Sequence, residues 1–133
     1  MKLTSTPFCL FFLILNFATY LLYGGESISI KLEIEHALGK GVEWINSEQN
    51  SSSGQWGEEE YPALTALALR STMGHPDLAV VQKYANQQAK GFSFILSKVQ
   101  SDGGIYGKGL ASYNTAICMM AMIQSKDPKY NEI

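Results

Sequence analysis

The sequence GVEWINS at residues 41–47 returns as GFSFILS at residues 91–97, with glycine, an aromatic residue, isoleucine and serine in the same places. The offset between the two stretches is 50 residues. Further on, GQW at residues 54–56 and GIY at residues 104–106 match at the same offset. Self-similarity at a fixed period of this length indicates tandem copies of one supersecondary unit.

The same offset relates TAL at residues 65–67 to TAI at residues 115–117. His-Pro and Asp-Pro dipeptides then follow the two stretches. We therefore predict two tandem repeats, the first over about residues 29–76 and the second over about residues 77–128.

Each predicted repeat begins with an amphipathic helix, over residues 29–48 in the first and 77–99 in the second. Apolar residues recur there at spacings of three and four, with charged residues on the other side. The predicted buried face contains Ile34, Leu38, Val42 and Ile45 in the first helix and Val81, Tyr84, Ala85, Gln88, Phe92, Ile95 and Val99 in the second.

The second helix of each predicted repeat is apolar almost all round, over residues 63–73 and 115–123. A helix of this kind is expected to be enclosed by other elements. Amphipathic and apolar helices in alternation form an outer and an inner layer when the pairs stack. We therefore predict an all-α fold of tandem helix hairpins, arranged as an α/α toroid or α-solenoid.

The loops between the paired helices carry the family resemblance. QSDGGIY at residues 100–106 resembles the Gln-x-x-x-Gly-x-Trp repeat of squalene and oxidosqualene cyclases, with tyrosine in place of tryptophan. QNSSSGQW at residues 49–56 is similar, with one extra residue. YNTA at residues 113–116 resembles the start of an inner helix in the same superfamily, which includes protein prenyltransferase β-subunits. The resemblance implies an α/α toroid, of which two helix pairs form an open part.

Six residues of these loops form the candidate repeat motif. A glutamine amide can bond two backbone groups at a helix end, glycine permits a tight turn, and an aromatic ring covers the loop. We expect these side chains to stabilise the repeats rather than to contact a substrate: Gln49, Gly54, Trp56, Gln100, Gly104 and Tyr106.

The catalytic residues that the resemblance implies have no counterpart in the sequence. Cyclases of the superfamily use an Asp-rich acid motif, whereas Asp77, Asp102 and Asp127 are isolated and are predicted to cap helices. The zinc of prenyltransferases implies Asp, Cys and His ligands, and the available residues lack ligand-like spacing: Cys118, His36 and His75. We therefore assign no catalytic, cofactor-binding or metal-ligating residue and no cofactor, and whether the chain is an enzyme stays open.

Three further groups have both a structural and a functional interpretation. Cys118 is interpreted as a small core residue rather than a nucleophile. The acidic run at residues 58–60 is interpreted as a solvated cluster before a helix, and otherwise as a contact at a pore mouth. The methionines of the last helix are expected to pack in the core, and otherwise to line an apolar cavity for an isoprenoid: Met119, Met120 and Met122, with Tyr113.

The N-terminus has the pattern of an export signal. Lys2 precedes an apolar run over residues 8–23, which fits a secretory signal peptide at residues 1–24. The run is shorter than the roughly 20 residues of a membrane span, which favours a cleaved signal over an uncleaved anchor. We therefore expect an exported protein, periplasmic or secreted, whose remaining domain covers residues 25–133. Without Lys2, 9 basic residues face 12 acidic ones, so nucleic acid is not expected as a partner.

The second predicted repeat is followed by only five residues where a third repeat would begin. This indicates either an N-terminal fragment or self-association through the apolar helix Thr115 to Ile123. We predict an exported, non-catalytic repeat module that binds an apolar ligand or a protein partner. The alternatives are the N-terminal part of a terpene cyclase-like or prenyltransferase-like enzyme acting on an isoprenoid, with catalytic residues beyond Ile133, and a degenerate piece without activity.

Overall fold

The fold is described by a computed structural model of the chain, which covers residues 28–130. The described residues are mostly helical and contain no β-strand, which confirms the all-α prediction. The predicted signal or anchor at residues 1–24 lies outside them. The chain divides into two units, Met1–Ala37 and Leu38–Ile133. None of the helices within residues 28–130 is long and apolar enough to cross a membrane.

The first described helix covers residues 28–47, in agreement with the predicted 29–48. Its predicted buried face is wrong in part, because Val42 is buried but Leu38 is 43% exposed. Within the second unit, the last turns of this helix contact the segment around Thr72, where Asn46 Nδ2 donates to Thr72 Oγ1 at 3.0 Å.

The two apolar helices are α2 (Pro62–Met73) and α5 (Ala111–Ser125). Pro62 occupies the first turn of α2, where its missing N–H would have no intrahelical partner anyway. α5 begins four residues before the predicted Thr115. Leu110, in the left-handed conformation with φ of 49°, caps it and accepts a hydrogen bond from the Asn114 N–H at 2.9 Å.

The predicted single helix over residues 77–99 is wrong, because the structure has two helices there, α3 (Leu78–Lys83) and α4 (Ala85–Leu96). They meet at Tyr84, whose φ of −104° and ψ of 19° depart from helical values. Tyr84 is buried at this break, and Gln88 Nε2 donates across it to the carbonyl of Val81 at 2.8 Å. A short 3₁₀ turn, η1 (Pro128–Tyr130), follows α5.

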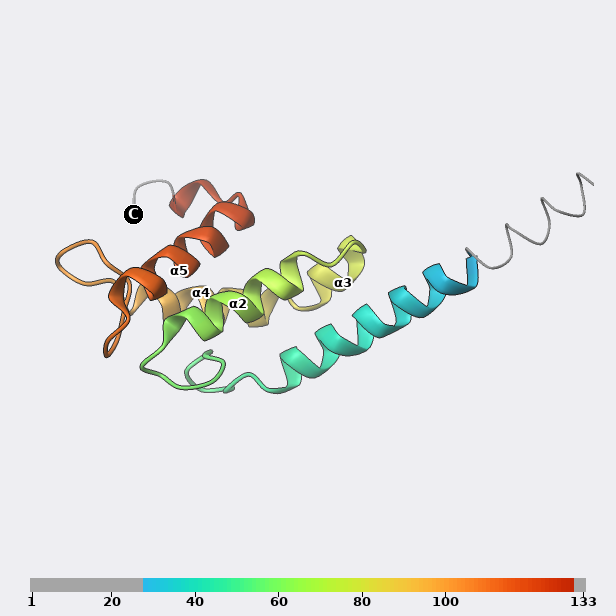
Figure 1. Cartoon of the computed structure of the whole chain (residues 1–133), viewed down its shortest axis with the longest axis horizontal. Coiled ribbons are helices and arrows are strands. Elements are labelled where there is room, and N and C mark those ends of the chain that lie inside the picture. Colours follow the sequence, from blue (N-terminus) through green and yellow to red (C-terminus); the bar gives the residue numbers. More distant parts are fainter. Residues whose placement is uncertain (1–27, 131–133) are drawn as a thin grey trace, which may run out of the picture. The chain divides into compact units, whose positions relative to one another are not determined.

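The helices α2 and α5 lie side by side and run in the same direction (Figure 1). At their starts, Asn114 Oδ1 accepts from the Ala63 N–H at 3.1 Å. At their ends, Arg70 Nε donates to Gln124 Oε1 at 3.1 Å. α4 runs in the opposite direction to α2, since Lys98, just after α4, bonds Glu59 just before α2 at 2.7 Å.

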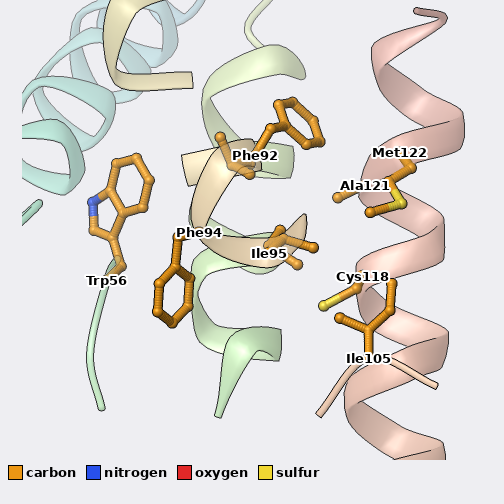
Figure 2. Close-up of a cluster of buried hydrophobic side chains, with 10 residues drawn as sticks. Trp56, Phe92, Phe94, Ile95, Ile105, Cys118, Ala121 and Met122 are labelled. Carbon is orange, nitrogen blue, oxygen red and sulfur yellow. The ribbon is translucent and has the colours of Figure 1, made fainter. Parts of the chain in front are cut away.

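The hydrophobic core lies between α2, α4 and α5 (Figure 2). Phe92 and Ile95 of α4 point into it, and the Phe92 ring stacks on Tyr130 with centroids 4.9 Å apart. The cluster consists of Trp56, Ala66, Leu69, Phe92, Phe94, Ile95, Ile105, Cys118, Ala121 and Met122.

The expectation that both apolar helices are enclosed is wrong for α5. Its Cys118 side packs in the core, but Met119 is 52% and Ile123 is 73% exposed on the opposite side. α2 also leaves Leu64 and Leu67 partly exposed. The reason is that, within residues 28–130, neighbouring helices cover α5 on one side only.

Replacing Asn114 by alanine tests the polar contact that joins α2 to α5. Asn114 is fully buried, and its amide also donates to the carbonyls of Gly109 and Leu110. We expect Asn114→Ala to lower the free energy of unfolding by ~2 kcal/mol, since buried backbone groups lose their partners. The measurement is urea unfolding followed by circular dichroism.

The matched control is Asn86→Ala on the exposed side of α4, where the change should stay within ~0.5 kcal/mol. Equal midpoints for the two variants would contradict this role of Asn114.

Candidate interaction surface

Each apolar helix holds the turn before it through a threonine hydroxyl. The Trp56 N–H donates to Thr65 Oγ1 at 3.0 Å, and the Ile105 N–H donates to Thr115 Oγ1 at 2.9 Å. The two threonines are 50 residues apart, as in the sequence pattern. A second pair of bonds has the same offset, because Ser47 Oγ and Ser97 Oγ each donate to a carbonyl three residues earlier at 2.7 Å.

The hydrogen bonds align the turns differently from the sequence motif. The turn that starts at Asn50 closes on the carbonyl of Gln55 at 2.9 Å, while the turn that starts at Gln100 closes on Gly104 at 2.8 Å. The second turn is therefore one residue shorter. It follows that the structural counterpart of Gly104 is Gln55, not the Gly54 of the motif.

Trp56 accordingly corresponds to Ile105 and not to Tyr106. The Trp56 and Ile105 side chains are both buried in the core, and Trp56 Nε1 donates to the carbonyl of Ile45 at 2.6 Å. Tyr106 is only half-buried, and its hydroxyl donates to Asp102 Oδ2 at 2.8 Å. The aromatic position of the motif is thus a core residue, Trp56, in one turn and a half-buried residue, Tyr106, in the other.

The Asp102 and Tyr106 pair has shifted proton affinities. The Gly104 N–H and the Tyr106 hydroxyl, both donating to the carboxylate, hold the pKa of Asp102 below its ordinary value. The hydrogen bond to Asp102 raises the pKa of Tyr106. Both contacts favour the charged carboxylate and the neutral phenol.

The motif glutamines each bond two backbone carbonyls. Gln49 Nε2 donates to Gly54 at 2.8 Å and to Gln87 at 2.9 Å, so it ties its turn to α4. Gln100 Nε2 donates to Lys98 at 3.1 Å and to Tyr106 at 2.8 Å, so both of its bonds stay within its own turn.

A groove of about 450 Å³ lies between the second turn and α5. We call it the α5 groove. Its lining is Asp102, Gly103, Gly104, Tyr106, Ala111, Ser112, Thr115, Ala116 and Met119. Four apolar residues of α5 are exposed, and of these Met119 lines the groove: Tyr113, Met119, Met120 and Ile123.

On the first predicted repeat, the position that corresponds to the groove lies between the first turn and α2. It is occupied by α4, which belongs to the second predicted repeat. A methyl group placed on Gly91 would lie 2.8 Å from Trp56 Cζ3 and 3.0 Å from Leu69 Cδ2. A methyl group placed on Gly54, whose φ is +80°, would lie 2.6 Å from the carbonyl oxygen of Lys90. The backbone of α4 thus sits directly on the first turn and on α2.

Three other candidate residues of the sequence, Asp77, Glu59 and His75, do not line the groove. Asp77 caps α3, since its Oδ1 accepts from the Ala79 N–H at 2.8 Å, as predicted. Glu59 of the acidic run pairs with Lys98. His75 Nδ1 accepts a hydrogen bond from the Asp77 N–H at 3.1 Å. Of the three methionines, Met122 alone packs in the core.

Within residues 28–130, no three His, Cys, Asp or Glu side chains lie close enough to hold a metal ion. No protein-family model, no curated protein and no solved structure matches the chain. The resemblance to cyclases and prenyltransferases therefore stays a prediction from the sequence.

The thiol of Cys118 should be unreactive in the folded chain. Cys118 is fully buried, and burial raises the pKa of its thiol to about 12. In a Cys9→Ser variant, we expect iodoacetamide to label Cys118 at pH 8 only after denaturant is added, because the thiolate is the nucleophile. Labelling is measured by mass spectrometry.

The same shift sets a pH dependence. The folded state holds the thiol proton more tightly than the unfolded chain, so the free energy of unfolding should fall as pH rises above the ordinary value of 9.0. Rapid labelling without denaturant would show that the core around Cys118 opens to solvent.

Proposed function

We propose that the chain is a non-catalytic interaction module that binds an apolar partner in the α5 groove. The supporting observation is that the exposed Met119 of α5 lines this groove, while the matching position on α2 is filled by a helix. Exposed apolar patches next to a hollow are typical of ligand or protein contacts.

The proposed architecture is an open part of an α/α toroid built from two helix pairs. The parallel packing of α2 on α5 supports it, and so do the threonine bonds that return after 50 residues. Such pairs bury their apolar faces only against neighbouring pairs. A face without its neighbour is therefore suited to binding. We also propose that the module acts outside the cytoplasm, on the strength of the apolar run at residues 8–23.

A fluorescent apolar dye tests the groove as a binding site. Wild-type chain should enhance the emission of the uncharged dye N-phenyl-1-naphthylamine, and Met119→Glu should weaken dye binding about tenfold, ~1.4 kcal/mol. The cause is a carboxylate placed at the apolar edge of the groove, which an apolar ligand would have to desolvate. Affinity is measured by titration of the dye.

Leu78→Glu is the matched control, because Leu78 is an equally large apolar residue that is exposed on α3, away from the groove. It should bind dye like the wild type. If Met119→Glu and Leu78→Glu bind dye equally well, the α5 groove is not the apolar site.

A further inference from the structure

α4 packs on a surface formed by the first turn, residues 49–56, and by α2. We call this surface the seat of α4. Besides the close approach of Gly91 described above, Gln49 bonds the carbonyl of Gln87. Lys90 Nζ donates to the carbonyl of Ser51 at 3.0 Å. Each of these contacts joins one predicted repeat to the other.

The α5 groove is the unfilled counterpart of that seat. Gly103 has a φ of +82°, close to that of Gly54, but a methyl group on Gly103 would meet nothing within 4 Å. Met119 stands 50 residues after Leu69. Leu69 is fully buried beneath α4, whereas Met119 is half-exposed.

The helix at residues 38–47 is the counterpart of α4 in the first predicted repeat, and the side that carries Gly41 and Trp44 is uncovered. A methyl group on Gly41 would meet nothing within 4 Å, in contrast to Gly91. Trp44 is 65% exposed, whereas Phe94, 50 residues later, is only 6% exposed. Within residues 28–130, no helix therefore packs on the second turn and α5 as α4 packs on the first turn and α2, and residues 41–47 are similar in sequence to residues 91–97 of the α4 region.

We infer that the α5 groove binds the helix at residues 38–47 of a second copy of this chain, in the way that the first turn and α2 bind α4. The inference rests on the proposed function, since it names the partner of the same groove. Gly41 of the second copy lies against Met119 and the second turn, and Trp44 is covered as Phe94 is.

The charges of the two faces are complementary. Within the chain, Lys98 after α4 pairs with Glu59 in the loop before α2 at 2.7 Å. Glu48 stands 50 residues before Lys98, and Lys108 lies in the loop before α5. The charges are opposite to those of the pair within the chain, since Glu48 takes the place of Lys98 and Lys108 takes the place of Glu59. Glu48 of one copy therefore meets Lys108 of the other. The Lys108 side chain is 82% exposed, and its contact with Glu60 is long, at 4.0 Å.

The resulting association is head-to-tail. Each copy offers the groove at one end and the helix at residues 38–47 at the other, so the interface is heterologous and adds copies until a ring closes. Association should therefore depend on concentration and proceed beyond the dimer.

Substitution of Gly41 separates association from folding. We expect Gly41→Leu to weaken self-association of the full chain at least tenfold, because its side chain collides with the second copy while finding open space within its own chain. The helix content of the variant should match the wild type. Gly39→Leu is the control, since Gly39 is equally open but its counterpart, Ala89, is exposed and not seated. Sedimentation velocity over a range of concentrations measures both.

Charge exchange tests the register. Glu48→Lys and Lys108→Glu should each weaken association severalfold, and the double variant should restore the wild-type affinity, because an ion pair forms again between copies. Residues 1–27 are common to all these chains.

Three results would overturn the inference. They are a wild-type chain that stays monomeric, equal association of Gly41→Leu and Gly39→Leu, and a double variant as weak as the single variants. A monomeric wild type that still loses dye binding on Met119→Glu would assign the groove to another partner and leave the proposed function intact. Loss of the Met119 effect would instead overturn the proposed function itself.

Discussion

The close approach of α4 to α2 at Gly91 is the constraint on which the rest of the structure depends. Because residue 91 is glycine, the Trp56 and Leu69 side chains can lie directly against the backbone of α4. From that position Phe92 and Ile95 reach the core, where α5 contributes Cys118 and Met122. A larger residue at this point would force the Trp56 and Leu69 side chains to move, and densely packed interiors have little room for such a change.

Hydrophobic periodicity and the 50-residue offset predicted the helix types, the end of α2 and the pairing of turns with inner helices. These features follow from local sequence, so a pattern can capture them. The break at Tyr84 was not predicted in this way, because the apolar spacing continues through Tyr84, and the Gln88 side chain that bonds the carbonyl of Val81 across the break is not part of that pattern. The early start of α5 likewise depends on a left-handed Leu110, a conformation that leucine rarely adopts.

The candidate site was only partly visible in the sequence. The motif glutamines and glycines marked the turns, but one shorter turn moved the register, so Ile105 and not Tyr106 shares the place of Trp56. The α5 groove emerged only from three-dimensional packing, by comparison of Gly103 with Gly54 and of Met119 with Leu69. The signal that could have indicated it is the similarity of residues 41–47 to residues 91–97, because similar helices are expected to pack on similar surfaces.

Photo-crosslinking from the groove tests the central claim most directly. A benzophenone side chain is placed at Ala116, which lines the groove, and the chain is mixed with an isotope-labelled copy before irradiation. Crosslinked peptides that join position 116 of one copy to residues 38–48 of the other are the predicted result. Crosslinks confined to one chain, or directed to another part of the second copy, would contradict the account.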